Sequence, residues 1–442
     1  MAETLCSVGL DVGTTTTQLI LSELRIENRA SSFSVPEMQI AQRKIRYKSP
    51  VHFTPLLGLD RVDGDAIRRI VLAEYEKAGI RRDDVNTGAI IITGETSRKE
   101  NARTVLNALS DFAGDFVVAT AGPDLESVLA AKGAGADAYS EKTGEAVLHM
   151  DIGGGTSNLA LIEDGEIVRT GCLNVGGRLL KFDETGGVSY VSPVLKGIFA
   201  KKVGEKPTMQ ELEALAKTLV SVLEMAASVR ERTDLLDAFV TAEAEGGWEP
   251  PRGEVTISFS GGVADCVETG HPHLAFGDMG PILGQAIKNS RLCKGKYRLG
   301  AETIRATVIG AGCHSAQLSG STVFYQHVEF PMKNLPVVRC VEELGHLDGP
   351  GVLALAGGAL NYAEVRALAE DLTCRWPKKP VLIALEADMA KALGHALALR
   401  LPRETPILCI DRVKFAPQSY LDVGTPLSSA IPVVVKTLIL NR

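Results

Sequence analysis

The chain has 442 residues, of which 45% are hydrophobic and 23% are charged, and its formal net charge is −7. This composition is ordinary for a globular protein, and the length predicts two or three domains. The negative net charge argues against a surface that attracts nucleic acid or an anionic membrane. The aromatic content of 5% argues against a base-stacking surface.

Eight cysteines are scattered along the chain and form no C-x-x-C pair. This usage favours reduced thiols over a disulfide framework or a structural zinc site. The first residues lack the basic region and apolar core of a signal peptide. The most apolar segment near the end, residues 431–440, is too short to span a bilayer. We therefore expect a soluble, intracellular protein.

Residues 5–24 predict a strand, a tight turn and a second strand, and Asp11, Gly13, Thr14 and Thr15 lie at the turn. Glycine lets backbone N–H groups close on an anion, and the threonine hydroxyls add further donors. An aspartate at the end of the first strand can face a hydrated Mg²⁺ at the phosphates. The segment therefore predicts one half of a nucleotide site.

A helix is predicted over residues 64–79, where Gly79 ends it, and a short buried strand over 89–93. Glu95 follows that strand and precedes a predicted helix over 97–109. It is the candidate that orients the attacking water or takes its proton. The alternative, an acid that caps the following helix, stays open.

A second turn of the same kind follows Asp151 and contains Gly153, Gly154, Gly155 and Thr156. The same chemistry applies to it, with backbone and hydroxyl donors for phosphate and an aspartate for the metal. The two aspartates are 140 residues apart. Two such turns in matched contexts predict the two halves of a clamp around one nucleoside triphosphate.

Two further elements are marked by local signals. Asp164 and Gly165 lie between apolar runs and predict a hairpin. Thr208 and Glu211 form a capping box at the start of the clearest predicted helix, over residues 208–232.

Ser260, Gly261 and Gly262 follow a further predicted strand and are the candidate adenosine contact, because only glycine lets a backbone lie flat against a purine. The pair Gly357 and Gly358 is a second candidate for that contact. For Gly261 and Gly262 the alternative is an ordinary turn.

Three observations limit the kind of nucleotide enzyme. The chain contains no G-x-x-x-x-G-K-[ST] loop, which argues against a P-loop enzyme. Residues 133–138 match G-x-G-x-x-A, but they follow a helical stretch, so Gly133 is interpreted as a helix end. No Lys or Arg occurs between Leu10 and Leu24, so the first turn brings no fixed cation to the phosphates. This predicts slow hydrolysis, suited to a switch.

The order of D-x-G-T-T, D-x-G-G-G-T and S-G-G resembles the superfamily of actin, sugar kinases and heat-shock chaperone ATPases. More narrowly, the whole chain resembles the reactivating factors of ethanolamine ammonia-lyase, the family of ethanolamine utilisation protein A. The segments that carry this resemblance are 92–102, 258–265, 304–312, 420–424 and 432–438. The resemblance implies an α/β, actin-like (ribonuclease H-like) two-domain ATPase clamp with an additional C-terminal α/β region.

The resemblance also implies a function. Such a factor uses ATP and Mg²⁺ to loosen the ethanolamine ammonia-lyase holoenzyme, so that damaged cobalamin leaves and intact adenosylcobalamin binds. The cobalamin belongs to the partner enzyme. In that reading the chain is a slow Mg²⁺-dependent ATPase that binds ATP and ADP, and Asp11 and Asp151 lie on the metal side. A cytoplasmic location follows, and a homodimer and association with a bacterial microcompartment are left open.

The expected domain organisation has four parts. Residues 1–145 form the first actin-like domain and 146–300 the second, while 301–322 return to the first domain and 323–442 form the additional region. Two other functions remain open on the same fold. One is a small-molecule kinase, which needs an aspartate base in a substrate pocket, and the other is a scaffold protein that uses nucleotide only for assembly.

Overall fold

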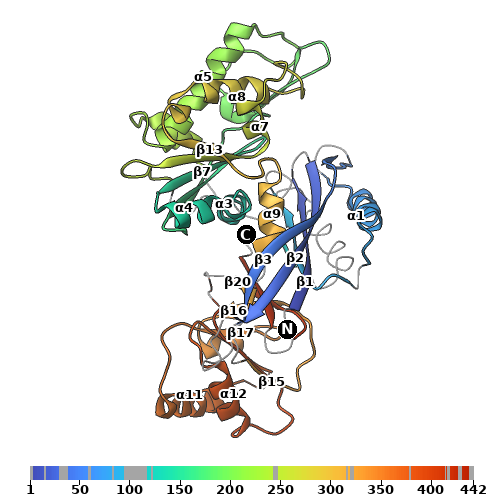
Figure 1. Ribbon diagram of the computed structural model, residues 1–442, viewed down its shortest axis with the longest axis vertical. Coiled ribbons are helices and arrows are strands. Elements are labelled where there is room, and N and C mark those ends of the chain that lie inside the picture. The colour runs from blue at the N-terminus through green and yellow to red at the C-terminus, as the bar shows by residue number, and fades with distance from the viewer. Residues whose placement is uncertain are drawn as a thin grey trace.

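The computed structural model describes most of the chain. The described ranges are 3–13, 16–28, 38–57, 61–81, 84–93, 117–120, 123–241, 247–314, 317–318, 323–377, 380–413, 415, 419–426 and 431–437. Thr14, Thr15 and Glu95, together with the helix predicted over 97–109, lie outside these ranges. Figure 1 shows an elongated molecule with three parts along its longest axis, the first lobe lying between the second lobe and a C-terminal region.

The first lobe is built on a six-stranded sheet of order β3-β2-β1-β5-β6, to which β4 adds by pairing with β2. Its strands are β1 (Glu3–Val12), β2 (Thr16–Asn28), β3 (Met38–Lys48), β4 (His52–Phe53), β5 (Thr87–Ile92) and β6 (Val117–Thr120). Helix α1 (Gly64–Ala78) covers one face, and α9 (Ala306–His314) packs on the other.

Helix α1 forms where the sequence predicts it. Asp63 caps its first turn by accepting a hydrogen bond from the backbone N–H of Ala66 at 2.9 Å. Gly79 ends it in the left-handed conformation that glycine adopts without steric cost. The strand predicted over 89–93 is β5, fully buried between α1 and α9.

The second lobe is built on a five-stranded sheet of order β13-β12-β7-β8-β9. Its strands are β7 (Val147–Ile152), β8 (Ser157–Glu163), β9 (Glu166–Leu173), β12 (Thr256–Ser260) and β13 (Tyr297–Leu299). Its helices are α3 (Pro123–Gly133), α4 (Ala136–Thr143), α5 (Met209–Ala226), α6 (Asp234–Phe239), α7 (Gly262–Glu268) and α8 (Gly280–Lys288). A small sheet of β10 (Leu180–Phe182) and β11 (Val188–Val191) and two 3₁₀ turns, Pro193–Leu195 and Arg291–Cys293, complete it.

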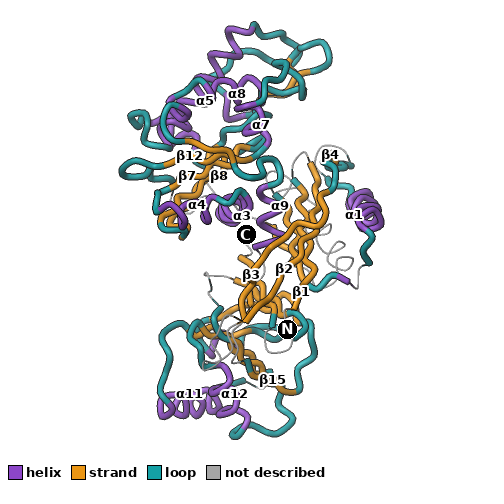
Figure 2. Tube along the Cα trace, in the orientation of Figure 1, coloured by secondary structure: helices purple, strands orange, loops and turns teal. Residues whose placement is uncertain are grey.

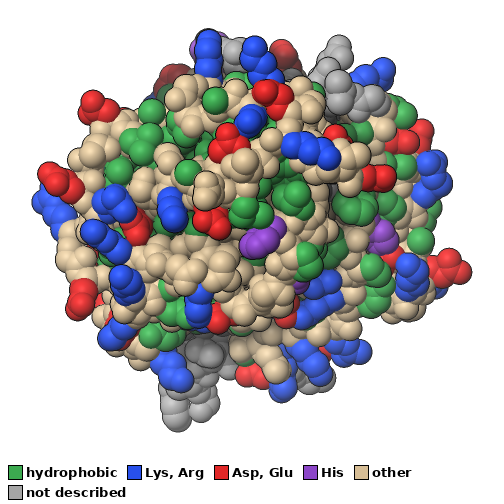
Figure 3. All heavy atoms as spheres, turned by 90° about the horizontal axis from the view of Figure 1, so that it is seen from above, with side chains coloured by type: hydrophobic (Ala, Val, Ile, Leu, Met, Phe, Trp, Pro, Cys, Tyr) green, Lys and Arg blue, Asp and Glu red, His purple; other side chains and the backbone are tan. Residues whose placement is uncertain are grey.

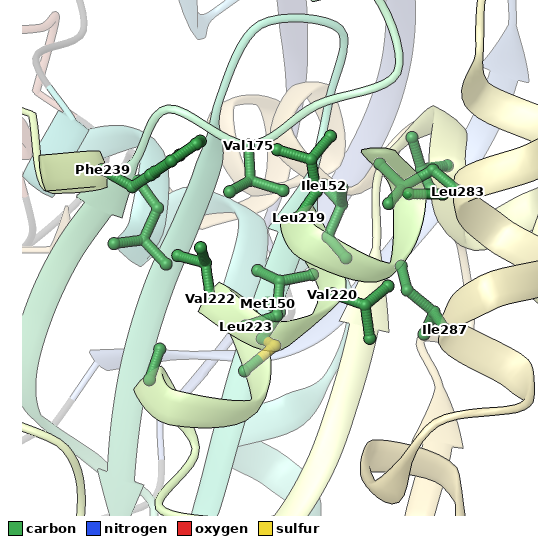
Figure 4. Packing of buried hydrophobic residues seen from close by; sticks show 14 of the residues in the cluster. Met150, Ile152, Val175, Leu219, Val220, Val222, Leu223, Phe239, Leu283 and Ile287 are labelled. Carbon is green, nitrogen blue, oxygen red and sulfur yellow. The ribbon is translucent and has the colours of Figure 1, made fainter. Parts of the chain in front are cut away.

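The two faces of this sheet are covered by different helices. Met150 and Ile152 of β7 point toward α5 and α8, where they pack in the largest hydrophobic cluster of the described residues (Figure 4). Val147, which alternates with them along the strand, packs with α3 and α4. The face that carries Val147 also carries Asp151.

Helix α5 begins as predicted, with the capping box of Thr208 and Glu211 in place. It ends at Ala226, so the predicted end at residue 232 is wrong. The reason is local, because Ser228 has a φ of 59° and the chain leaves the helical conformation there. The hairpin predicted at Asp164 and Gly165 is confirmed between β8 and β9.

Both lobes follow one plan. In each, a strand pairs antiparallel with the next strand of a hairpin and parallel with a later strand, which pairs parallel with an edge strand. Thus β3-β2-β1-β5-β6 corresponds to β9-β8-β7-β12-β13. The repeated plan confirms the predicted actin-like pair of α/β lobes.

Helices α3 and α9 lie between the two sheets and cross at close range (Figures 1 and 2). A Cβ atom on Gly133 would overlap the carbonyl oxygen of Ala306, and one on Gly310 would overlap that of Leu129. Glycine is required at both positions because the backbones touch. Gly133 is the last residue of α3, which agrees with its interpretation as a helix end.

The C-terminal region is an eight-stranded sheet of order β14-β21-β20-β16-β17-β18-β19-β15 with helices on one face. The strands are β14 (Gln317–Leu318), β15 (Phe324–Gln326), β16 (Met332–Val338), β17 (Val352–Leu355), β18 (Val381–Leu385), β19 (Ile407–Ile410), β20 (Ser419–Val423) and β21 (Pro432–Thr437). The helices are α10 (Val341–Leu344), α11 (Tyr362–Arg375) and α12 (Ala390–Ala398). Val434 of β21 packs with Leu5 and Ala311, so this region contacts the first lobe.

The surface shows no segregation by charge on the face seen in Figure 3, where basic and acidic side chains are interspersed. Within the described residues, no helix has both the length and the hydropathy needed to cross a bilayer.

Candidate functional site

Two aspartates occupy matched positions in the two lobes. Asp11 lies near the end of β1 and Asp151 near the end of β7. Burial raises the pKa of Asp11 to about 7, a hydrogen bond from Thr93 opposes the rise, and the charge of Asp151 adds to it. The charge of one lobe's aspartate thus acts on the aspartate of the other lobe. Burial likewise raises the pKa of Asp151 to about 6, against hydrogen bonds from Ser260 and Thr307.

Each aspartate is oriented by a hydroxyl from the neighbouring parallel strand. Thr93, which follows β5, donates to Asp11 Oδ1 at 2.8 Å. Ser260, at the end of β12, donates to Asp151 Oδ1. Thr307, in the first turn of α9, adds a longer contact of 3.4 Å to Asp151 Oδ2. Helix α9 thus contacts the aspartate of the second lobe while packing on the first.

A buried histidine extends the hydrogen bonds behind Asp151. His149 Nε2 lies 2.9 Å from Ser260 Oγ, and Nδ1 lies 3.1 Å from Ser258 Oγ. Burial and the positive charge of Arg298 lower the pKa of His149 to about 3, so its ring is neutral. Because Ser260 donates to Asp151, it accepts from Nε2–H, and Nδ1 then accepts from Ser258. The order of donors runs from Ser258 through His149 and Ser260 to Asp151.

The turn at residues 153–156 is closed by its own hydrogen bonds and is packed from behind by a second glycine segment. Gly153 N–H donates to the carbonyl of Thr156 at 2.9 Å, and Gly177 N–H donates to the carbonyl of Gly153 at 3.0 Å. A side chain on Gly176 would overlap the backbone of Gly154, so this residue must be glycine. A side chain on Gly155 would meet nothing within 4 Å, so the front of the turn is open. This geometry suits an anion held by backbone donors.

The first turn has the same closure where the structure describes it. Gly13 N–H donates to the carbonyl of Thr16 at 2.9 Å, as Gly153 does to Thr156. Thr54 donates to the carbonyl of Gly13 at 2.8 Å and bonds Thr17. The roles assigned to Thr14, Thr15 and Glu95 stay predictions outside the described residues.

The motif predicted to contact adenosine stands beside the second turn. Gly261 has a φ of 88° and no room for a side chain against the end of β7, and Gly262 begins α7 with open space around it. The hydroxyl of Ser260 is bound to Asp151, whereas the adenosine contact stays a prediction for all three residues. Gly357 and Gly358 follow β17, in the sheet that carries neither phosphate turn.

One cation near the second turn was missed by the sequence reasoning. The stem of Arg178 lies against Gly154, and its Nε donates to Asp278 Oδ2 at 3.0 Å. Asp278 also accepts from the N–H of Gly280 at the start of α8. Residues 10–24 around the first turn contain no Lys or Arg, whereas Arg178 reaches the second turn from a separate loop. Its position directly after Gly176 and Gly177 was the available signal.

Two buried amide side chains were also missed. Gln18 lies directly opposite Asp11 on β2, and Asn158 lies directly opposite Asp151 on β8. The available signal was an amide residue seven positions after each aspartate. Together the two carboxylates and two amide oxygens form a set of hard oxygen donors, which fits a hydrated Mg²⁺.

Comparisons with known proteins agree with the family resemblance seen in the sequence. The family described as "Ethanolamine utilisation protein EutA" matches residues 3–350 and 350–441. A protein of Salmonella typhimurium named "Ethanolamine ammonia-lyase reactivase EutA" is 40% identical over 475 residues, which cover 98% of each chain. A protein of Escherichia coli with the same name is 39% identical over 472 residues, again covering 98% of each chain. Among solved structures, an Aquifex aeolicus Ppx/GppA phosphatase aligns with 70% of this chain and 99% of its own, at 13% identity and a TM-score of 0.40.

Proposed function

This chain belongs to the family of ethanolamine utilisation protein EutA, and on that basis we propose that it is an ATP-dependent reactivase of ethanolamine ammonia-lyase. The observation that carries the proposal is the 40% identity to a protein of that name across 98% of both chains. Similarity along the full length matters here, because the actin-like fold alone is compatible with many activities.

We propose that the two lobes hold one ATP between them. The N–H groups of Gly154, Gly155 and Thr156 would bind phosphate oxygens, and Arg178 would add a positive charge from the side. Asp11 and Asp151 would accept hydrogen bonds from the waters around Mg²⁺. The ion itself would neutralise phosphate charge.

The hydroxyls behind the aspartates have a defined part in this proposal. Thr93 and Ser260 hold the carboxylates in one orientation, and the neutral ring of His149 keeps the Ser260 hydroxyl pointed at Asp151. Such preorganisation lets the carboxylates receive the hydrated ion without rearrangement. No Lys or Arg occurs between Leu10 and Leu24, around the first turn, so we expect hydrolysis slower than the 1–100 s⁻¹ typical of kinases.

The coupling to the partner enzyme would pass through the contact of the two lobes. Thr307 of α9 bonds Asp151, while the same helix packs on β1 and crosses α3. A nucleotide bound to both aspartates would therefore favour one relative position of the lobes. That position would hold the lyase in a form that releases damaged cobalamin and admits intact adenosylcobalamin.

The test is recovery of ethanolamine ammonia-lyase that has been inactivated with cyanocobalamin. We expect recovery with the wild-type chain, ATP, Mg²⁺ and free adenosylcobalamin, and none when ATP is left out. A chain with Asp63→Asn, which alters a helix cap on the far face of the first sheet, is the control and should support the same recovery as the wild-type chain. Absence of recovery by a wild-type chain that binds ATP would contradict the proposal. Phosphate transfer to a small molecule would then indicate a kinase, and ATP-dependent sedimentation a scaffold.

A further inference from the structure

We infer that Gln18 and Asn158 bind water molecules of the hydration shell of the nucleotide's Mg²⁺, one in each lobe. The inference rests on the proposed use of Mg²⁺ and ATP, and it adds two residues to that site. It follows from the position of the two amides, from their buried oxygens and from the donors that such waters carry.

The two amides hold equivalent positions. The antiparallel register places Gln18 opposite Asp11 and Asn158 opposite Asp151, so each amide lies on the same face of its sheet as the aspartate. In both lobes that is the face turned toward α3 and α9. Ile20, two residues beyond Gln18, packs on α9, and Ala160, two residues beyond Asn158, packs with α3 and α4.

Each amide is anchored through its nitrogen. Gln18 Nε2 donates to the carbonyl of Ile304 at 3.2 Å, just before α9. Asn158 Nδ2 donates to Glu126 Oε2, on α3, at 2.7 Å. Because both partners are acceptors, the orientation of each amide is determined, and the oxygen is the end left over.

Both oxygens are buried without a hydrogen-bond partner in the part of the chain that the structure describes. Gln18 is 3% exposed and Asn158 is 4% exposed. Leaving a buried acceptor unsatisfied costs about 1–3 kcal/mol, so native proteins rarely do so. Two such acceptors at equivalent positions beside two carboxylates point to a ligand that brings donors to both.

Water in the shell of a cation is that ligand. Its lone pair faces the ion, so it offers only its two O–H groups, and it needs two acceptors. A carboxylate and an amide oxygen facing each other across a hairpin supply that pair in each lobe. A lysine or arginine in place of Gln18 would offer donors alone and would form an ion pair with Asp11. The absence of Lys and Arg between Leu10 and Leu24 agrees with this arrangement.

The experiment separates the oxygen of Gln18 from its nitrogen. Gln18→Met removes both, whereas Gln18→Glu keeps an oxygen acceptor and loses the N–H that binds Ile304. ADP binding is measured by calorimetry over a series of Mg²⁺ concentrations, and Mn²⁺ binding by electron paramagnetic resonance. We expect Gln18→Met to raise the Mg²⁺ concentration for half-maximal tight binding about tenfold, as for the loss of one hydrogen bond in a charged site. For Gln18→Glu we expect the Mg²⁺ concentration for half-maximal tight binding to stay at or below that of the wild-type chain.

Asn158→Leu provides an independent variant with the same expected rise, and thermal unfolding checks that each variant folds. Trp376→Phe is the matched control, because the Nε1 of Trp376 is also buried without a hydrogen-bond partner among the described residues, but in the C-terminal region. Equal shifts in Gln18→Met and Gln18→Glu would overturn the inference in favour of a structural role through Ile304, and so would no shift in either. A wild-type chain whose ADP binding ignores Mg²⁺ would instead overturn the proposed function.

Discussion

The two lobes share one strand order but hold their aspartates differently. In the second lobe, Asp151 receives hydrogen bonds from Ser260 and Thr307, and His149 stands behind Ser260. In the first lobe, Thr93 is the hydroxyl that the structure places on Asp11. Among the residues that the structure describes, the same fold therefore supports one carboxylate that accepts from two hydroxyls and one that accepts from a single hydroxyl. We expect the second lobe to define the site and the first to adjust to the nucleotide.

The largest effect is expected where the two lobes touch. Gly310→Ala places a methyl group on the carbonyl oxygen of Leu129, and Gly133→Ala places one on that of Ala306. Backbone atoms cannot move aside as a flexible side chain can, so each variant should lose about 2–3 kcal/mol of unfolding free energy. Chemical denaturation measures this loss.

The control for these variants is Gly270→Ala, because a Cβ there would meet nothing within 4 Å. It should change the unfolding free energy by less than about 0.5 kcal/mol. If Gly310→Ala were as stable as Gly270→Ala, α3 and α9 would not cross at the described distance.

The next effect compares the hydroxyls that orient the two aspartates. Ser260→Ala should lower the rate of ATP hydrolysis about ten- to a hundredfold, because Asp151 and His149 both lose a partner. Thr93→Val should lower it about tenfold or less, since it removes one hydrogen bond. Steady-state rates at saturating ATP and Mg²⁺ measure both. A larger loss of rate in Thr93→Val than in Ser260→Ala would contradict the view that the second lobe defines the site.

A smaller effect concerns stability without metal or nucleotide. A carboxyl group whose folded pKa is raised stabilises the folded state below its unfolded pKa, and this contribution is lost as the pH rises through the folded value. For Asp11 this stabilisation is lost as the pH rises from about 4 to about 7, because its pKa is raised to about 7 in the folded chain. At pH 8 the Asp11 carboxylate is ionised and buried, which destabilises the folded state. Asp11→Asn removes this charge and should therefore raise the unfolding temperature of the metal-free chain.

The same variant should raise that temperature much less at pH 5, where the Asp11 carboxyl is already protonated in the folded chain. Asp151→Asn should show the same sign with a smaller gain, because its pKa is raised only to about 6. Thermal unfolding in a chelator at pH 5 and pH 8 measures both variants. A gain for Asp11→Asn that is independent of pH would contradict the burial of an ionised carboxylate at this position.

Local signals were sufficient to predict much of the fold. The capping residues of α1 and α5, the hairpin at Asp164 and Gly165, and the two aspartate turns each depend on a few neighbouring residues. The family resemblance then predicted the two-lobed arrangement. The end of α5 was predicted six residues late, because the periodic apolar pattern continues past the point where Ser228 leaves the helix.

What the sequence reasoning missed depends on contacts between distant segments. Gln18 joins the site only through its register with Asp11, and Ser258 joins it only through a histidine on a different strand. Arg178 reaches the second turn from a loop that the sequence marks only by two glycines. The repeated strand order of the lobes was also missed, since the shared plan lies in the pairing of strands and extends beyond the turns.

The most direct test of the account is the number of ATP molecules that one chain binds, measured by calorimetry in the presence of Mg²⁺. We predict one ATP per chain, with affinity reduced in both Asp11→Asn and Asp151→Asn, because the two lobes act on the same nucleotide. Two ATP molecules per chain, or binding that depends on one aspartate and ignores the other, would contradict the shared site.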